Sequence, residues 1–248
     1  MTSDADSGPV RIAMWSGPRN ISTAMMRSFG SRQDTFVTDE PFYGAFLRDT
    51  GEPQPMAEQI IADMDCDWHS VTSSLKGPVP AEKPIWYQKH MPHQMTGPIS
   101  ISDFPDHRHA FLIRDPVRVV GSYAAKRVKV TPEDLGYERQ LRYVEEIAEK
   151  TGKLPFVVDS AAILQNPGKV LKQLCQALGI SWDPAMLGWT AGVRDTDGIW
   201  GSHWYNRVVE TTGFGRPPGP PPQLEERDRK VAENCRDYYD KLLEYSFI

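Results

Sequence analysis

Side chains able to bind an anion are concentrated in residues 12–29, where a short apolar run is followed by Ser16, Gly17, Pro18, Arg19 and Asn20. Apolar residues then recur at helical spacing, so the stretch predicts a strand, a tight turn and the start of a helix. This arrangement directs backbone N–H groups at an anion. Gly17 has no Cβ to hold a ligand away, and Arg19 brings a permanent positive charge. With the hydroxyl groups of Ser22 and Thr23, the turn predicts an anion-binding site.

This turn differs from the phosphate-binding loop of the nucleoside triphosphatases. That loop ends in Gly-Lys-Ser/Thr, whose hydroxyl holds Mg²⁺. Residues 16–23 lack the lysine, and the glycine spacing is different. Taken alone, the turn is also compatible with an ordinary connection between a strand and a helix, so its interpretation depends on the rest of the chain.

Three further apolar runs end in polar residues. They are followed by Asp39 and Glu40, by Lys89 and His90, and by Arg114 and Asp115. Helical patterns separate the runs, which predicts a mostly parallel sheet covered on both faces. Because ligands bind at the carboxyl ends of such strands, we expect the four polar clusters to converge on one site.

The remaining pattern predicts one three-layer α/β domain over residues 10–248, preceded by a disordered segment over residues 1–9. We expect helices over residues 56–64, 133–150, 170–178 and 225–245, and a fifth strand over residues 156–158. Pro116 suits the first position of another helix. Residues 190–222 are rich in glycine, proline and aromatic residues, and they predict a long loop near the active site.

Composition limits the classes of partner. The chain has 248 residues, of which 40% are hydrophobic and 25% charged, and these values predict a globular protein with a sizeable core. A net charge of −5 argues against a broad nucleic-acid surface. The three scattered cysteines favour a reducing compartment. Residues 1–10 lack the features of a signal peptide, and no apolar run approaches the roughly 20 residues of a membrane span. We therefore expect a cytoplasmic protein with no nucleic-acid partner and no membrane partner.

With these segments identified, the chain resembles the sulfotransferases that use 3′-phosphoadenosine 5′-phosphosulfate (PAPS). Residues 16–29, SGPRNISTAMMRSF, look like the 5′-phosphosulfate loop of the bacterial and tyrosylprotein enzymes, in which arginine replaces lysine. Residues 113–123, IRDPVRVVGSY, look like the family's 3′-phosphate motif, with Arg114 at a strand end and Ser122 eight residues later. Residues 156–180 look like the family's late strand and helix. The resemblance covers about residues 10 to 190.

The resemblance implies a P-loop-type sulfotransferase fold and PAPS as co-substrate, with 3′,5′-ADP as product. It implies cofactor contacts from Ser16, Gly17, Pro18, Arg19, Asn20, Ile21, Ser22, Thr23, Arg114 and Ser122. The cofactor needs two anion sites, and a guanidinium group fits a phosphate well. Since the sulfuryl group carries less charge than a γ-phosphate, we expect no metal. The histidine pairs of this chain lack the further ligands of a zinc site.

Transfer to an alcohol also requires a base for the hydroxyl proton. Glu40 follows Arg19 by 21 residues, a distance similar to that of the catalytic glutamate in the bacterial and tyrosylprotein enzymes. His90 lies in Lys-His-Met-Pro, which is similar to the Lys-Thr-His-Leu-Pro segment of the cytosolic enzymes but lacks the threonine. We rank Glu40 before His90. Lys89 is expected to stabilise charge on the sulfuryl and bridging oxygens, and Arg19 to share that role.

Plainer interpretations remain open at this point. Glu40 is compatible with a helix cap, His90 with a core histidine, and Arg114 with a local ion pair to Asp115. The family's adenosine-binding Arg-Lys-Gly segment is absent, and the substitutes that the sequence offers without a ranking are Arg194, Arg207 and Arg216. The aromatic residues that fit either the core or a ligand pocket are Trp200, Trp204 and Tyr205.

The sequence therefore predicts a PAPS-dependent sulfotransferase that transfers a sulfuryl group to a hydroxyl or amine of a small molecule. One alternative is an ATP-dependent phosphotransferase, which would need the metal-binding pair that the loop lacks. Another is a non-catalytic nucleotide-binding protein, such as a sensor of 3′,5′-ADP. The identity of the acceptor and the oligomeric state have no readable signature.

Overall fold

Five apolar runs of the sequence form one parallel sheet in the order β2-β3-β1-β4-β5. The computed structural model describes residues 8–127 and 129–246, so the disorder expected for residues 1–9 falls largely outside the described residues. The strands are β1 (Val10–Ser16), β2 (Thr35–Asp39), β3 (Ile85–His90), β4 (Arg108–Ile113) and β5 (Phe156–Asp159).

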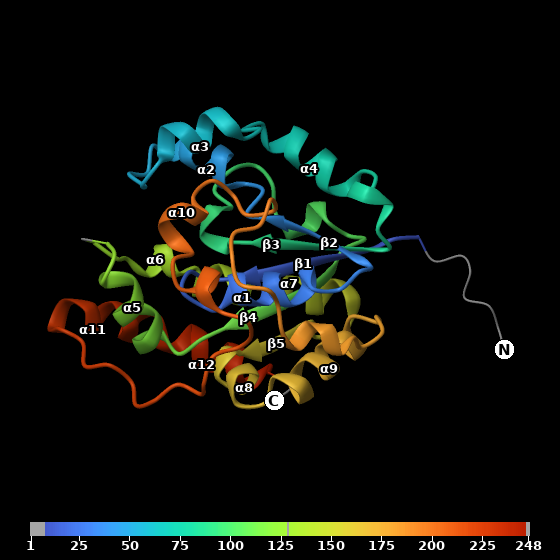
Figure 1. The fold of residues 1–248 in the computed structure, drawn as a ribbon. Coiled ribbons are helices and arrows are strands. Elements are labelled where there is room, and N and C mark those ends of the chain that lie inside the picture. Colours follow the sequence, from blue (N-terminus) through green and yellow to red (C-terminus); the bar gives the residue numbers. More distant parts are fainter. Residues whose placement is uncertain (1–7, 128, 247–248) are drawn as a thin grey trace.

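The register brings the carboxyl ends of the strands to one edge of the sheet. Trp15 of β1 pairs with His90 of β3, and Ser16 pairs with Leu112 of β4. Asp39, the last residue of β2, pairs with Lys89. The polar residues that follow the strands therefore share one edge, on the side where α5 and α10 lie (Figure 1).

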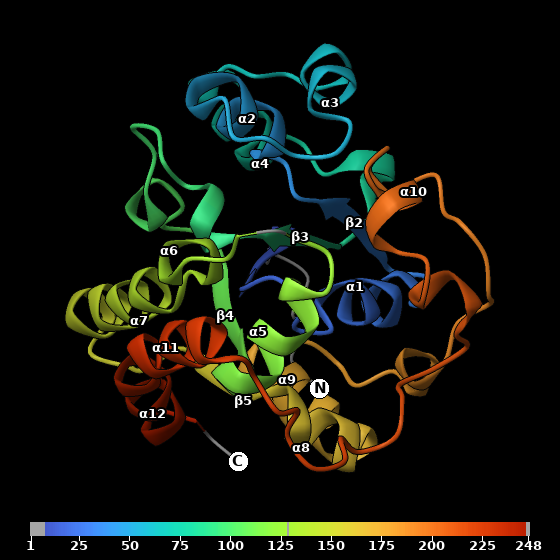
Figure 2. The same ribbon diagram turned by 90° about the vertical axis from the view of Figure 1, so that its left-hand side faces the viewer.

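Helices cover both faces of the sheet, which confirms the predicted three-layer α/β fold. On one face lie α1 (Ser22–Gly30), α8 (Ser160–Gln165) and α9 (Pro167–Ala177); on the other lie α4 (Trp68–Lys76), α7 (Tyr137–Thr151) and α12 (Arg236–Glu244) (Figure 2). Phe29 of α1 stacks on Tyr87 of β3, with ring centroids 4.4 Å apart. On the opposite face, Tyr143 of α7 packs edge-on against Trp15 at 5.0 Å.

The remaining helices and turns lie in the connections between these elements. The helices are α2 (Tyr43–Thr50), α3 (Ala57–Asp63), α5 (Pro116–Ala124), α6 (Pro132–Leu135), α10 (Gly201–Trp204) and α11 (Glu226–Asn234). Single 3₁₀ turns are η1 (Pro80–Glu82), η2 (Pro92–Gln94), η3 (Ile101–Asp103), η4 (Pro184–Leu187) and η5 (Val208–Glu210). Among the described residues, no helix is both long and apolar enough to cross a membrane.

Two of the expected helices are wrong in extent. The helix expected over residues 133–150 is divided into α6 and α7 because Gly136 has a φ of 72°, in the left-handed region that favours glycine. The helix expected over residues 225–245 is divided into α11 and α12 around Cys235. The first turn of α4, for which the sequence pattern gave no separate bounds, is capped by the side chain of Asp67.

Candidate active site

The loop between β1 and α1 has an unusual backbone. Arg19 and Ile21 have φ values of 57° and 49°, so both adopt the left-handed conformation that side chains rarely take. The side chain of Asn20 holds the loop to the sheet by donating a hydrogen bond from Nδ2 to the carbonyl oxygen of Leu112, at 2.6 Å. A backbone held in this way is typical of functional loops.

Six of the eight loop residues predicted to bind the cofactor line a cavity of about 810 Å³ at the carboxyl edge. They are Pro18, Arg19, Asn20, Ile21, Ser22 and Thr23. Ser16 and Gly17 lie beneath it: Ser16 is fully buried, and its hydroxyl group donates to the carbonyl oxygen of Gly17. A Cβ on Gly17 would lie 2.6 Å from the carbonyl oxygen of Leu135. Gly17 is thus required by the approach of α6 to the loop.

The predicted 3′-phosphate motif lies against this loop. Arg114 donates a hydrogen bond from Nη1 to the carbonyl oxygen of Arg19, at 2.6 Å. Arg19 in turn donates from Nε to the hydroxyl oxygen of Ser122, at 3.1 Å. Asp115 caps α5 and forms an ion pair with Arg236 at 3.0 Å, so the local pair between Arg114 and Asp115 does not form. Arg114 and Ser122 both line the cavity.

The cavity wall is strongly cationic although the protein as a whole is acidic. Among its lining residues, the charged side chains are one carboxylate, Glu40, and the seven cations Arg19, Lys89, Arg114, Arg118, Lys126, Arg207 and Arg216. Burial lowers the pKa of Arg19, and the neighbouring charge of Arg207 lowers it further. Burial and the charge of Arg118 likewise lower the pKa of Arg114. Such mutual repulsion would be relieved by an anion in the cavity.

Glu40 and Lys89 meet at the floor of the cavity. The ammonium group of Lys89 lies 2.7 Å from Glu40 Oε1 and 2.8 Å from Asp39 Oδ1, and it also donates to the hydroxyl oxygen of Tyr205 at 2.7 Å. Gln94 donates to the second oxygen of Glu40 at 2.6 Å. Glu40 has a φ of 38°, because the chain turns sharply after β2 to begin α2. Neither carboxylate oxygen of Glu40 caps a helix.

His90 lies on the other face of the sheet. Successive side chains of a strand point to opposite faces, so Lys89 faces the cavity and His90 does not. The imidazole ring of His90 stacks on Trp15 at 4.6 Å and approaches Gln88 Oε1 at 3.3 Å. It is 1% exposed, and burial holds its pKa well below the ordinary value. His90 is absent from the cavity wall, whereas His93 belongs to it.

The loop over residues 190–222 forms the outer wall of the same cavity. Trp200, Trp204 and Tyr205 line it, together with Arg207 and Arg216. Arg194, the third arginine offered by the sequence, lies instead in a second cleft. The residues that sequence reasoning missed are Asp39 as a partner of Lys89, Gln94 as a partner of Glu40, and Tyr205 as a partner of both Asp39 and Lys89.

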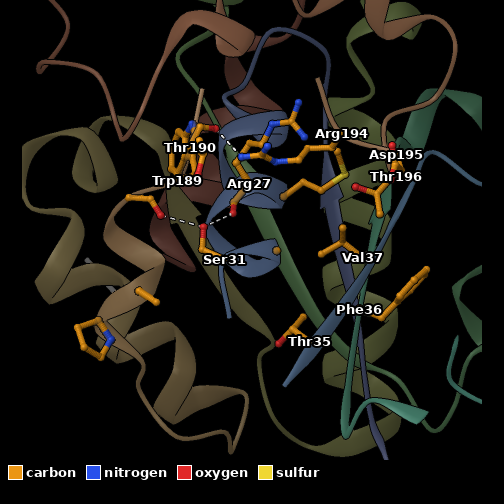
Figure 3. Close-up of a pocket in the computed structure, with 15 residues that line it drawn as sticks. Arg27, Ser31, Thr35, Phe36, Val37, Trp189, Thr190, Arg194, Asp195 and Thr196 are labelled. Carbon is orange, nitrogen blue, oxygen red and sulfur yellow. Dashed lines mark hydrogen bonds between the residues drawn. The ribbon is translucent and has the colours of Figure 1, made fainter. Parts of the chain in front are cut away.

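The second cleft, of about 840 Å³, lies between α1, the open edge of β2 and residues 184–196 (Figure 3). Of the residues that the sequence offered for the site, its wall contains Arg194 alone. Arg27 forms its inner wall and an ion pair with Asp197 at 2.6 Å, in which both side chains are buried. This pair anchors the loop that carries Trp200 and Tyr205 to the end of α1.

Comparisons with known proteins identify the family of the chain. The pattern of the family described as "Sulfotransferase domain" matches residues 10–242. The chain therefore belongs to the sulfotransferase domain family. A sulfotransferase from Alicyclobacillus acidocaldarius has a similar fold, with a TM-score of 0.54, 12% identity, and coverage of 97% of this chain and 94% of that chain.

Two plant proteins are more similar in sequence. The chain is 30% identical over 235 residues to the Arabidopsis thaliana protein named branched-chain-amino-acid aminotransferase-like protein 2. It is 32% identical over 212 residues to the one named branched-chain-amino-acid aminotransferase-like protein 1. The matches cover 93% and 84% of this chain but only 41% and 37% of the plant proteins. The chain thus spans about two fifths of the length of these relatives.

Proposed function

We propose that this protein transfers a sulfuryl group from PAPS to a hydroxyl group of a small molecule. The observation that carries this proposal is the contact between the two predicted anion sites, through Arg114, Arg19 and Ser122, on one wall of a cationic cavity. Membership of the sulfotransferase domain family supports the same conclusion.

The donors of the cavity fit a nucleotide with two separate anionic groups. Arg114 and Ser122 are suited to the 3′-phosphate, and the loop over residues 18–23 is suited to the 5′-phosphosulfate. A guanidinium group can contact phosphate oxygens with two parallel hydrogen bonds. The N-terminus of α1, a helix of nine residues, adds unpaired backbone N–H groups beside the loop. Among the described residues, no group of three histidine, cysteine or acidic side chains is placed to hold a metal ion.

When bound, PAPS would supply an activated sulfuryl group whose sulfur–oxygen bond to phosphate can break. Glu40 accepts the proton that the acceptor hydroxyl loses as its oxygen forms a bond to sulfur. The electron pair of the broken bond remains on the phosphate oxygen of 3′,5′-ADP, and Arg19 stabilises the charge that develops there. The products are a sulfate ester and 3′,5′-ADP.

The charges around Glu40 support its role as the base. Asp39, Glu40 and Lys89 together carry a net charge of −1, and one proton taken up by Glu40 neutralises the cluster. The side chain of Glu40 is 10% exposed and belongs to the cavity wall, whereas that of Asp39 is 1% exposed and does not. Glu40 is therefore the carboxylate that an acceptor can reach.

The same charges favour a hydroxyl acceptor over an amine. At neutral pH an alkyl amine is an ammonium ion, and the cavity wall offers it one carboxylate among seven cations. That carboxylate already accepts hydrogen bonds from Lys89 and Gln94. A cationic acceptor would therefore meet like charges on a wall whose carboxylate is already paired, which is costly in a confined site.

A thermal-shift assay followed by an acceptor screen tests the proposal. We expect 3′,5′-ADP to stabilise the protein more than ATP with Mg²⁺ does. With PAPS and a panel of alcohols and phenols, mass spectrometry should detect acceptors that gain one SO₃ unit. Preferential stabilisation by ATP with Mg²⁺ would instead indicate a phosphotransferase. Binding of 3′,5′-ADP without any transfer would indicate a nucleotide sensor.

A further inference from the structure

All three N–H donors of Lys89 are already used within the protein. An ammonium group has three donors and no acceptor. Those of Lys89 are directed to Asp39 Oδ1 at 2.8 Å, Glu40 Oε1 at 2.7 Å and Tyr205 Oη at 2.7 Å. Lys89 is 1% exposed. In this arrangement no N–H group of Lys89 is left to contact a sulfuryl or phosphate oxygen.

The three acceptors of Lys89 differ in how firmly they are held. Asp39 Oδ2 accepts hydrogen bonds from Tyr205 Oη at 2.6 Å and from the backbone N–H of Gly198 at 3.3 Å. Tyr205 Oη also accepts from Trp200 Nε1 at 3.1 Å. Asp39 and Tyr205 thus hold each other in place, Tyr205 on the cavity wall and Asp39 outside it. Glu40 and Tyr205 both lie on the cavity wall, but of the three acceptors only Glu40 changes charge in the proposed reaction.

This inference rests on the proposed function. We propose that protonation of the base, Glu40, frees one N–H group of Lys89 to donate a hydrogen bond to the leaving oxygen. As long as Glu40 is ionised, it holds one N–H group of Lys89. When Glu40 takes the proton of the acceptor hydroxyl, it becomes a weaker hydrogen-bond acceptor, and that N–H group can turn to the phosphate oxygen that receives the electron pair. Lys89 keeps its three protons throughout. Asp39 and Tyr205 are positioning residues that hold the other two N–H groups.

In this arrangement the loss of the acceptor proton and the stabilisation of the leaving oxygen by Lys89 occur together. Lys89 can contact the leaving oxygen only as the proton of the acceptor departs, so Lys89 contributes more to the transition state than to the bound substrate. Interactions of that kind raise the rate of the chemical step. They leave the affinity for the nucleotide almost unchanged.

The titratable groups facing Lys89 support a charged ammonium group. They are Asp39 and Glu40 at the end of β2, Tyr205 after α10, and Tyr87 on β3 itself. Burial alone would lower the pKa of Lys89, but the charges of Asp39 and Glu40 raise it well above the ordinary value. Burial also raises the pKa of Tyr205, so its hydroxyl group stays protonated and donates to Asp39.

Two variants test the charge of Asp39 and the hydroxyl group of Tyr205. Asp39→Asn keeps an oxygen for Lys89 but removes the charge and the second oxygen, which accepts from Tyr205 and Gly198. The pKa of the buried ammonium group should therefore fall. We expect kcat to fall about 10- to 100-fold and to decline further between about pH 7 and pH 10, where the wild type is flat. Tyr205→Phe removes one acceptor but leaves the charge. Its kcat should fall by a similar factor without the added decline at high pH.

Affinity for 3′,5′-ADP, measured by calorimetry, should stay within about threefold of the wild type in both variants. The matched control is Tyr239→Phe, which removes another buried tyrosine hydroxyl bonded to an aspartate, Asp159, at 2.8 Å. This control should keep the wild-type kcat and pH profile. Wild-type kcat and pH profiles in Asp39→Asn and Tyr205→Phe, with transfer still lost in Glu40→Gln, would overturn the inference while leaving the proposed function intact.

A readout without ligand tests the same arrangement. In Asp39→Asn only Glu40 would offset the burial of Lys89, so the pKa of Lys89 should fall. Once this pKa lies below that of the unfolded chain, the folded state binds fewer protons and gains stability as the pH rises. The difference in Tm between wild type and variant should therefore shrink between about pH 7 and pH 10. A constant difference would contradict the charge coupling, even if the wild type showed no transferase activity.

Discussion

Arg19 Nε donates a hydrogen bond to Ser122 Oγ at 3.1 Å, which joins the loop after β1 to α5. These side chains come from two motifs that the sequence separates by about a hundred residues. Because Arg114 also binds the carbonyl oxygen of Arg19, the two motifs form one continuous surface. We propose that the ligand of this surface carries two anionic groups, as an adenosine with 3′- and 5′-phosphates does.

The role of Glu40 is tested by Glu40→Gln. The amide cannot accept a proton, so we expect transfer to slow by about 10²–10⁴ while 3′,5′-ADP binds as in the wild type. Steady-state rates and calorimetry measure the two effects. The glutamine keeps the shape of the side chain and an oxygen for Lys89, so a loss of nucleotide binding would instead indicate a damaged site.

His90→Asn is the companion variant. His90 lies behind the sheet, stacked on Trp15, so we expect a lower Tm and a transfer rate within a few-fold of the wild type. Inactivity of this variant at a temperature where circular dichroism shows it folded, together with wild-type rates in Glu40→Gln, would reverse the assignment of the base.

The cationic wall predicts a dependence on acceptor charge. Phenols that differ only in the para substituent can be compared with the same reacting hydroxyl group. We expect kcat/KM to be at least about 10-fold lower for an aminoethyl substituent than for an ethyl substituent, because like charges in a confined site cost several kcal/mol. Added salt should bring the ratio of the two kcat/KM values closer to one. Equal rates for the two phenols in low salt would show that the cations do not face the acceptor.

Stability should decrease in mild acid. Burial lowers the pKa of His93 and His109 to about 4 and that of His107 to about 3, against 6.5 for a free imidazole. The folded chain therefore binds fewer protons than the unfolded chain as the pH falls from about 6.5 towards 4, and each unit of pKa difference is worth about 1.4 kcal/mol per group. Urea unfolding at several pH values measures this loss.

The imidazole of His107 accounts for part of that acid sensitivity. Its Nε2 lies 3.1 Å from Gln88 Oε1, a contact that an asparagine amide can partly replace. In His107→Asn the free energy of unfolding should depend less steeply on pH between about pH 6.5 and pH 4. A slope identical to that of the wild type would exclude His107 as a source.

Gly17 tests the packing under the loop. In Gly17→Ala the new Cβ would lie 2.6 Å from a backbone oxygen of Leu135, which cannot move aside as a flexible side chain could. We expect a loss of about 1–3 kcal/mol in unfolding free energy, typical of overpacking, and weaker binding of 3′,5′-ADP. Gly168→Ala is the control. Gly168 lies in α9, and a Cβ there would meet only Leu187, at 3.9 Å. A harmless Gly17→Ala would mean that the loop has room to shift.

Much of the site could be predicted because it follows strand ends. Arg19, Glu40 and Arg114 follow the ends of β1, β2 and β4, and Lys89 is the next-to-last residue of β3. A parallel sheet brings such positions to one edge. The sequence alone does not decide whether Lys89 or His90 faces the cavity. Alternation along β3 says that they face opposite ways, but only the packing of α1 against Tyr87 decides which face has the cavity.

The hydrogen-bond partners of Lys89 could not be predicted from the sequence. Tyr205 and Asp39 are separated by 166 residues, and the hydrogen bond between them depends on the path of the loop over residues 190–222. That loop has no periodicity from which a path could be inferred. The division of α6 from α7 at Gly136 was missed for a different reason: an isolated glycine in a helical pattern is often tolerated.

The preference between nucleotides with and without a 3′-phosphate tests the central claim most directly. Calorimetry should give tighter binding of 3′,5′-ADP than of 5′-AMP to the wild type. Arg114→Ala should cost roughly 2–4 kcal/mol for 3′,5′-ADP and little for 5′-AMP, so that the preference disappears. Equal affinities in the wild type, or an equal loss for both nucleotides in the variant, would contradict an account in which Arg114 and the loop after β1 hold the two ends of one nucleotide.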